Sequence, residues 1–274
     1  MSTHLRRDDS IDHVAVSGQT TAAAESALHV KSVAKAFRVL EAFRDGGPFL
    51  GLADLVDATG MDKSTVQRFT YTLKQMGYLE QDPATRRYAL GRRVLDLSFG
   101  FLNSHTLTAR AAPVLVDLRQ AVQERVDLSI PDGTSLLYVI RMQAKREHYS
   151  TALVGRRLPL FCASGGRAML AHMPEQEALD VVMRSNRRQY TPMTITDVDT
   201  IMEEVGKARR QGYAVQVGEW RLGEMAAGAA VTNKNGEPIA AVHVAVSTDS
   251  WSLDEMKSRV VPLLVNAAAA ISGM

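Results

Sequence analysis

The chain of 274 residues contains a single cysteine, Cys162, and seven histidines that are scattered along it. One cysteine cannot form an intrachain disulfide framework or a cysteine metal cluster. The histidines show no spacing typical of metal ligands, so the sequence predicts no metal site and no cofactor. It also lacks any run of about 18 apolar residues, which predicts that no helix spans a membrane.

The N-terminal stretch lacks the apolar core of a secretory signal and contains acidic residues early. A cytoplasmic location is the default expectation. Residues 1–27 are rich in Ser, Thr, Ala and Gly, and we predict a disordered arm there. The net charge is only +2, but residues 31–110 carry twelve Lys and Arg against eight Asp and Glu. This modest local surplus suits a protein that reads a DNA sequence better than one that coats DNA.

The most informative segment runs from Gly51 to Tyr88. A short apolar helix pattern leads to a turn at Thr59-Gly60-Met61, and a second helix pattern follows, with Asp62 as its cap. Val66, Phe69, Leu73 and Met76 form the apolar stripe of the second helix. Two short strand patterns follow it. This order predicts a helix-turn-helix with a β-hairpin wing, which is a device for reading DNA.

The outward face of the second helix carries donors and acceptors rather than Glu and Lys pairs. Arg can pair with guanine and Gln with adenine in the major groove. The first turn of a helix favours phosphate oxygens. The expected DNA contacts from this helix are Lys63, Ser64, Thr65, Gln67, Arg68 and Tyr71. The alternative is a module of the same shape that contacts protein, or a solvated polar face.

The wing is predicted around the turn at Asp82-Pro83, with Arg86 and Arg87 at or near its tip. Beside a reading helix, such arginines typically meet the DNA backbone or the minor groove. The alternative is that both are simply solvated.

Flanking helices are predicted on both sides of this segment. Residues 31–44 form one, with a stripe of Val33, Ala36, Phe37, Leu40 and Phe43. Residues 92–105 form an apolar helix that needs partners on two sides, which suggests a dimer seam. A further helix is expected over 111–125, with Pro113 in its first turn.

From Asp127 onward, strand and helix patterns mix. A hairpin at Pro131-Asp132-Gly133, a loop from Val154 to Gly166, and strands near the C-terminus predict an α+β domain, an antiparallel sheet with helices on its faces. Helices are expected near 175–185 and 198–211, and from Leu253 to Ile271. The predicted domains are the arm 1–27, a winged helix-turn-helix over 28–91, a linker helix over 92–109, and a second domain over 110–274.

The chain resembles the IclR-type bacterial transcriptional regulators from about residue 30 to the end. The matching motifs are SVAKAFRVLEAF, MDKSTVQRFTYTLKQMGYLEQDPATRRYALG, GRRLPLFCASGGRAMLA, RRQGYAV and MAAGAAVTNKNGEPIAAVHVAV. The resemblance implies a winged-helix domain that binds a double-stranded DNA operator, a linker helix, and a GAF-like domain that binds a small effector. It also implies homodimers, often paired into tetramers.

The resemblance implies an effector pocket, carried over position by position onto this sequence. Its residues are Ser164, Gly165, Gln216, Glu219, Ala226, His243 and Ala245, and Cys162 and Ala163 of the loop that contains Ser164 are added to them. The loop of small residues before a helix that starts near Arg167 is also a plausible anion site. Many members of the family bind small organic acids with such loops.

Three departures from the family pattern bear on the effector. Ala226 and Ala245 replace residues that are often small and polar, and Gln216 stands where an acid is frequent. His243 lies in an otherwise apolar strand. We therefore expect a roomier, drier pocket and an aromatic carboxylate or an analogue, held by Ser164, Gln216 and His243. The alternative for His243 is a hydrogen-bonded core residue.

The predicted function is an effector-controlled transcriptional regulator that is not an enzyme, with a repressor favoured over an activator. Two alternatives stay open. Cys162 could make the protein a redox-responsive regulator, although a lone cysteine beside Phe161 is more often an apolar filler. Ser164 and His243 could serve as nucleophile and base of a hydrolase, although no GxSxG elbow surrounds Ser164.

Overall fold

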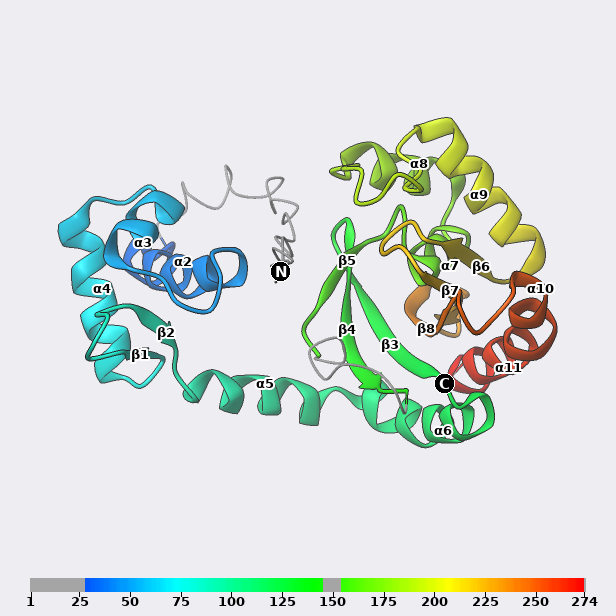
Figure 1. Ribbon diagram of the computed structural model, residues 1–274, viewed down its shortest axis with the longest axis horizontal. Helices are drawn as coiled ribbons and strands as arrows, with labels where there is room; N and C mark the ends of the chain where they lie inside the picture. The colour runs from blue at the N-terminus through cyan, green and yellow to red at the C-terminus, as the bar shows by residue number, and fades with distance from the viewer. Residues whose placement is uncertain (1–27, 145–153, 274) are drawn as a thin grey trace, which may run out of the picture. The chain divides into compact units, whose positions relative to one another are not determined.

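The computed structural model describes residues 28–144 and 154–273 (Figure 1). The arm predicted over residues 1–27 lies outside the described residues. The chain divides into two compact units, of which the first ends at Ser104 and the second begins at His105. Residues 105–109, which the sequence analysis assigned to the linker, therefore group with the second unit.

The first unit is a helix-turn-helix followed by a β-hairpin. Its elements are α2 (Lys31–Asp45), α3 (Leu52–Thr59), α4 (Lys63–Gln75), β1 (Leu79–Gln81), β2 (Tyr88–Leu90) and α5 (Arg93–Ser104). The hairpin is antiparallel, with Leu79 opposite Leu90. The core of the unit joins residues from α2, α3, α4 and β1: Val39, Phe43, Leu50, Leu55, Met61, Val66, Leu73 and Leu79.

Local chemistry fixes the turn between α3 and α4. Gly60 ends α3 with a left-handed backbone (φ +65°), which a residue without Cβ adopts at little cost. Asp62 then caps α4, because its carboxylate accepts from the Thr65 backbone N–H at 2.9 Å. The Ser64 and Thr65 hydroxyls each donate to the same carboxylate at 2.7 Å. These hydrogen bonds hold the pKa of Asp62 well below its usual range.

Two predicted stripes in this unit are partly wrong. On α2, Val39 and Phe43 are buried, whereas Val33 and Phe37 are exposed. The buried face of α2 is set by packing against α3 and α4, which cover only its second half. Met76 is 48% exposed because α4 ends at Gln75, so that residue lies beyond the stripe.

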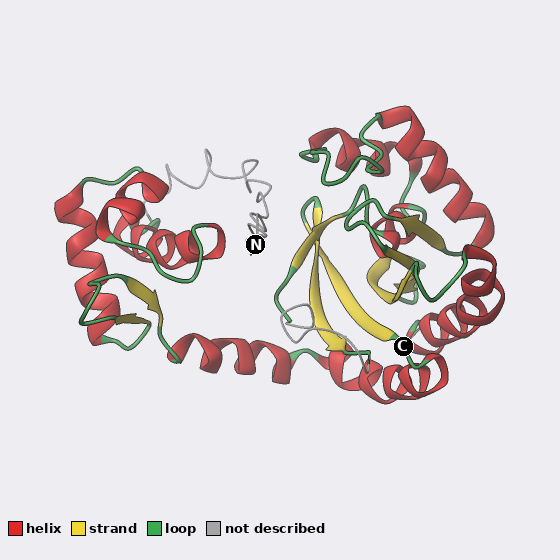
Figure 2. Ribbon diagram, viewed as in Figure 1, coloured by secondary structure: helices red, strands yellow, loops and turns green. Residues whose placement is uncertain are grey.

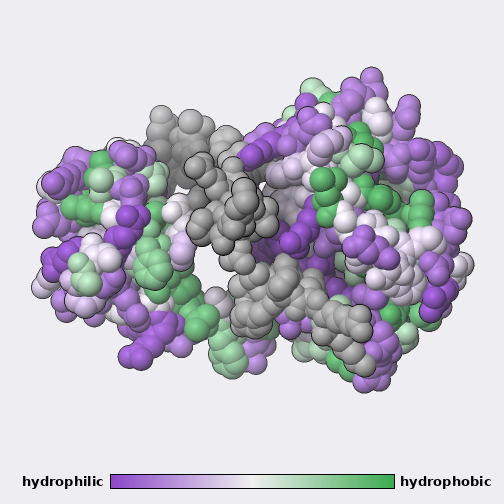
Figure 3. Space-filling view, in the orientation of Figure 1, coloured by the Kyte–Doolittle hydropathy of each residue, from purple (hydrophilic) through white to green (hydrophobic). Residues whose placement is uncertain are grey.

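Helix α5 buries none of its residues within the chain. Leu95 and Phe99 are 70% and 71% exposed, and Leu97 and Phe101 are also exposed. Figure 3 shows this apolar surface as green over the helix. A monomeric protein rarely exposes a continuous apolar helix face.

The second unit is built on one six-stranded antiparallel sheet, in the order β5-β4-β3-β8-β7-β6. The strands are β3 (Arg125–Asp132), β4 (Ser135–Met142), β5 (Arg157–Pro159), β6 (Ala214–Val217), β7 (Glu224–Thr232) and β8 (Pro238–Ser247). The helices are α6 (Thr106–Val122), α7 (Ser164–Leu170), α8 (Glu175–Arg184), α9 (Val198–Gln211), α10 (Leu253–Glu255), a π-helical turn (Met256–Val260) and α11 (Val261–Ile271).

Two groups of helices cover the sheet (Figure 2). One group is α7, α8 and α9, with α7 packed on β7 and β8. The other is α6 and α11, which pack on each other and on the sheet. The predicted α+β architecture, with a helix-turn-helix unit followed by an antiparallel sheet and helices, is confirmed.

Several predicted boundaries in this unit are wrong. Helix α6 starts at Thr106, so Pro113 lies inside it and removes one backbone donor there. The predicted loop 154–166 contains strand β5, and α7 begins at Ser164 instead of near Arg167. Short elements of this kind have too few residues to show a period in the sequence. No described helix combines the length and the apolar character needed to cross a bilayer.

Candidate functional site

The reading face predicted on α4 is exposed. Lys63, Gln67, Arg68 and Tyr71 all lie at the surface, and Tyr71 is 64% exposed. Within the described residues none of these four side chains has a hydrogen-bond partner. Ser64 and Thr65 differ, because their hydroxyl protons are already donated to Asp62. Four of the six predicted helix residues therefore offer unused donors or acceptors.

The structure separates the two wing arginines. Arg86 lies at the tip with a left-handed backbone (φ +61°), and its exposed side chain has no partner among the described residues. Arg87 instead donates to the Phe49 carbonyl, at 2.9 Å from Nη2, and to the Asp54 carboxylate at 2.8 Å. Asp54 lies in the first turn of α3. Arg87 thus ties the wing to the helix-turn-helix.

The second unit contains a cavity over the middle of the sheet. Six of the nine predicted effector residues line it: Ala163, Ser164, Gln216, Ala226, His243 and Ala245. Its volume is about 20 Å³, which is room for one water molecule. The strand register explains why these residues meet.

Two neighbouring cross-strand rows form the floor of the cavity. The first row is Gln216, Ala226, Ala245 and Arg125, and the second is Gly228, His243, Asp127 and Arg141. The rows are two residues apart on each shared strand, so their side chains point to the same face of the sheet. Residues from five different strands therefore converge on one site.

The cavity is charged, so the expectation of a drier pocket is wrong. Its charged lining residues are Arg125, Asp127, Arg141, Arg156, Arg221 and Glu224. None of these six residues was predicted from the sequence. One signal was available, since Arg125 and Asp127 alternate with Val126 and Leu128 on a strand buried on both faces, which places charges in the interior.

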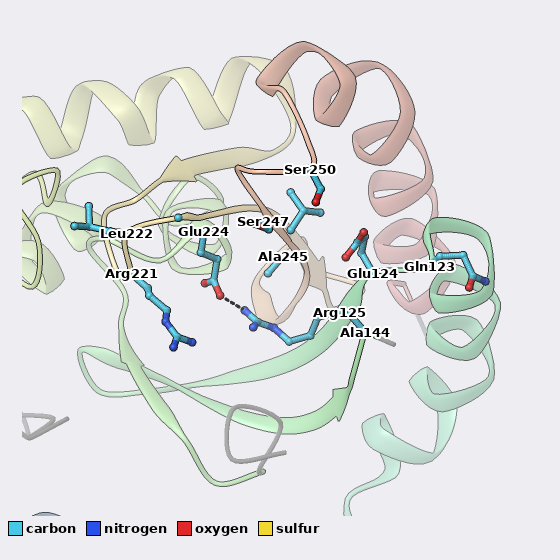
Figure 4. A pocket seen from close by; sticks show the side chains of 12 residues that line it. Gln123, Glu124, Arg125, Ala144, Arg221, Leu222, Glu224, Ala245, Ser247 and Ser250 are labelled. Atoms are coloured by element: carbon cyan, nitrogen blue, oxygen red, sulfur yellow. Dashed lines mark hydrogen bonds and ion pairs between the residues drawn. The ribbon is translucent and has the colours of Figure 1, made fainter. Parts of the chain in front are cut away.

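Ion pairs connect four of these groups. Arg141 Nε donates to Asp127 Oδ1 at 3.0 Å, and Arg125 Nε donates to Asp127 Oδ2 at 3.2 Å. Arg125 Nη2 also donates to Glu224 Oε2 at 3.0 Å, as Figure 4 shows. An outer hollow of about 460 Å³ opens beside the cavity and shares Arg125, Arg221, Glu224 and Ala245 with it.

Three buried donors around the cavity have no hydrogen-bond partner among the described residues: Arg141 Nη1, Arg156 Nε and Ser164 Oγ. The Ser164 residue is 2% exposed. A buried donor without a partner costs free energy comparable to a lost hydrogen bond. A ligand with acceptor oxygens would remove that cost at all three.

His243 is buried and neutral. Its Nε2 lies 2.7 Å from the Ser129 hydroxyl, and its ring meets the Tyr138 ring edge-on at 5.2 Å between centroids. Burial, reinforced by Arg141 and Arg125, lowers the pKa of His243 to about 3. The ring also lies against Gly165, where an added Cβ would come within 2.1 Å of Cε1. This bonding to Ser129 does not support a nucleophile–base pair of Ser164 and His243.

Three predicted effector residues do not line the cavity. Gly165 packs against the His243 ring and the backbone of Gly228. Glu219 forms a buried bidentate ion pair with Arg167, with nitrogen–oxygen distances of 2.6 and 2.8 Å. Cys162 is fully buried, and burial raises the pKa of its thiol, which argues against a reactive thiolate and a redox sensor.

The Glu219 carboxylate also accepts from the Ile195 backbone N–H at 3.1 Å. The backbone N–H of Glu219 donates to Gln216 Oε1 at 2.9 Å. Glu219 and Arg167 therefore hold α7 and the turn after β6 together behind the cavity, and they fix the orientation of Gln216.

Comparison with known protein families finds a match for each of the two units. Residues 99–273 match the family model for the bacterial transcriptional regulator IclR C-terminal domain, and residues 32–83 match the IclR helix-turn-helix domain. The chain belongs to the IclR family. Members of this family are transcriptional regulators with a DNA-binding helix-turn-helix domain and an effector domain, and they are not enzymes.

The Pca regulon regulatory protein of Pseudomonas putida is 27% identical over 238 residues, which cover 86% of this chain and 81% of that protein. An IclR transcriptional regulator from Alicyclobacillus acidocaldarius has a similar structure, with a TM-score of 0.77 and 26% identity over 89% of this chain and 98% of that chain. An IclR homologue from Microbacterium hydrocarbonoxydans, complexed with 4-hydroxybenzoate, has a TM-score of 0.72 and 23% identity over 88% and 97% of the two chains.

Proposed function

We propose that this IclR-family regulator binds an organic acid in the charged cavity of its second unit and changes its affinity for an operator in response. The observation that carries the proposal is a set of three buried donors, from Arg141, Arg156 and Ser164, that have no hydrogen-bond partner in residues 28–144 and 154–273. A carboxylate offers acceptors for all three, and its charge complements the guanidinium groups.

An aromatic carboxylate is the favoured effector. Tyr138 and Trp220 line the cavity beside the donors, and they offer apolar surface to a ring. The relative that holds 4-hydroxybenzoate supports the same class. Because the cavity now has room for one water molecule, a ring must displace side chains when it binds. Arg221, which is exposed and lines both the cavity and the outer hollow, is one side chain free to move.

Binding would be tested by isothermal titration calorimetry on the full chain with benzoate, 4-hydroxybenzoate, pyruvate and glyoxylate. We expect an aromatic acid to bind and Ser164→Ala to weaken that binding about tenfold, the worth of one charge-assisted hydrogen bond. Binding of pyruvate or glyoxylate but of neither benzoate would reject the aromatic class. Binding that Ser164→Ala leaves unchanged would reject the cavity.

On DNA, we propose that Gln67, Arg68 and Tyr71 read bases and that Lys63 and Arg86 contact phosphates. An operator would be selected from random duplexes and binding measured by fluorescence anisotropy. Arg68→Ala should cost about 1–3 kcal/mol and relax the preference at one base position. Equal losses on the selected operator and on random DNA would contradict a base-reading role for Arg68.

We further propose that the protein acts as a dimer, with pairing into tetramers, and as a repressor. The exposed apolar face of α5 supports a partner helix on it. Sedimentation equilibrium of Leu95→Ser and Phe99→Ser variants should show weaker association than wild type. A reporter gene behind the selected operator should be expressed more strongly when the regulator is deleted, and weaker expression would indicate an activator.

A further inference from the structure

This inference rests on the proposed effector cavity and concerns the charge of the ligand. Four arginines line the cavity against two carboxylates. His243 adds no charge at neutral pH, because its pKa is lowered to about 3 by burial. The lining therefore carries an excess of two positive charges.

The two carboxylates of the lining already form ion pairs with two of its arginines. Asp127 binds Arg125 and Arg141, and Glu224 binds Arg125, so these four groups neutralise one another. Even so, Arg141 keeps Nη1 buried and without a hydrogen-bond partner in the described part of the chain. The network therefore supplies a free donor but no net charge.

The two excess positive charges of the lining are those of Arg156 and Arg221. Neither forms an ion pair with any residue that the structure describes. Arg156 is partly buried, its guanidinium lies 5.6 Å from the centre of the Trp220 ring, and burial lowers its pKa. Figure 4 shows Arg221 extended next to the Arg125–Glu224 pair without joining it. The partly buried Arg156 guanidinium is costly without a counter-ion unless a ligand brings the charge. Arg221 is exposed, so its charge is solvated until a ligand binds.

The donors also come from separate elements. Ser164 begins α7, Arg141 lies on β4, Arg156 precedes β5, and Arg221 lies between β6 and β7. A single monocarboxylate brings one negative charge, which leaves half of the excess of two positive charges without a counter-ion. We infer that the effector is a dicarboxylic acid, with one carboxylate at Ser164 and Arg141 and the second near Arg156 and Arg221.

The experiment is calorimetry on the full chain with matched pairs of probes. Benzoate is compared with phthalate, isophthalate and terephthalate, hexanoate with adipate, and phenyl phosphate serves as a dianion with a single anionic group. We expect at least one dicarboxylate to bind ten times or more tightly than its monocarboxylate match. Arg156→Gln and Arg221→Gln should each reduce that preference at least threefold.

Two controls separate charge from folding. Arg156→Lys keeps the charge and should keep most of the preference, and the exposed Arg210→Gln on α9 should leave it unchanged. Thermal unfolding without ligand should show all variants folded, since neither Arg156 nor Arg221 has an ion pair to lose among the described residues.

Two results would overturn the inference while the proposed function stands: monocarboxylates that bind as tightly as their dicarboxylate matches, or phenyl phosphate that binds more tightly than every dicarboxylate. An unchanged preference in both Arg→Gln variants would also overturn it. Absence of binding by every acid in the panel would instead reject the proposed function, and this inference with it.

Discussion

The two units of this protein present polar side chains in opposite ways. On the first unit they stand on the exposed face of one helix, α4, where Gln67, Arg68 and Tyr71 lie within five consecutive residues. In the second unit most of them are buried or partly buried, and they come from elements far apart in the chain. Asp127 and His243 are cross-strand neighbours although 116 positions separate them.

The difference fits the functions that we propose for the two sites. DNA is a large polyanion in water, so a reading surface can remain solvated until the duplex replaces the solvent. A small ligand is recognised by convergent groups in a site that excludes water. There, each unpaired donor costs free energy until the ligand arrives. We therefore expect substitutions that leave a buried charge unpaired in the second unit to change stability strongly, and those of the unpartnered side chains on α4 and the wing tip to change mainly DNA affinity.

The largest effect is expected when the buried ion pair between Arg167 and Glu219 behind the cavity is broken. Glu219→Gln leaves Arg167 buried without its counter-ion and should lower the free energy of unfolding by about 3–5 kcal/mol. Urea unfolding measures this. Glu204→Gln breaks the exposed pair with Lys207 on α9 and should cost no more than about 1 kcal/mol. Similar losses in the two variants would remove the contrast between buried and exposed charges.

The second effect concerns pH. The pKa of His243 is about 3 in the folded chain, whereas its ordinary value is 6.5. Between pH 3 and pH 6.5, the unfolded chain therefore binds a proton at His243 that the folded chain does not bind. This contribution destabilises the protein as pH falls below 6.5, by up to about 1.4 kcal/mol per pH unit. It is absent above that pH.

His243→Gln keeps a hydrogen-bonding group for Ser129 but cannot titrate. Its stability should fall less steeply than that of wild type between pH 6.5 and 4.5, as measured by urea unfolding at each pH. The carboxylates titrate in both proteins and cancel in the difference. Parallel curves would show that His243 is not held neutral by burial.

The smallest effect tests the two wing arginines against each other. Arg87→Ala removes the tie to Phe49 and Asp54 and should lower the stability of the first unit by up to about 1 kcal/mol, because the pair is exposed. Arg86→Ala should leave stability unchanged. It should reduce by about one the slope of a plot of the logarithm of DNA affinity against the logarithm of salt concentration. The reverse pattern would show that Arg87 is the DNA contact and Arg86 the structural residue.

The helix-turn-helix could be predicted from sequence because its signals are local. The Asp62 cap, the glycine before it and the 3.6-residue period of Val66, Phe69 and Leu73 all lie within fifteen residues. The buried face of α2 was harder to predict, because the neighbouring helices determine which half of α2 is covered. Arg86 and Arg87 are adjacent and identical in type, so no sequence pattern could separate their roles.

The cavity of the second unit was only partly predictable. Ser164, Gln216, Ala226, His243 and Ala245 came from resemblance to a family, and the structure places all five around one cavity. The arginines opposite them were missed. A strand shows which residues share its face, but it does not show which strands will be its neighbours or in what register they pair.

The sequence alone determined the local elements and the order of the two units, because caps, turns and hydrophobic periods act over a few residues. The tertiary structure decided the charge of the cavity. Only the pairing of β3 with β8 and of β3 with β4 brings Arg125 and Asp127 beside His243 and Arg141. Electrostatic energies inside a protein depend on such distances and on burial, and these are fixed only when the sheet is assembled.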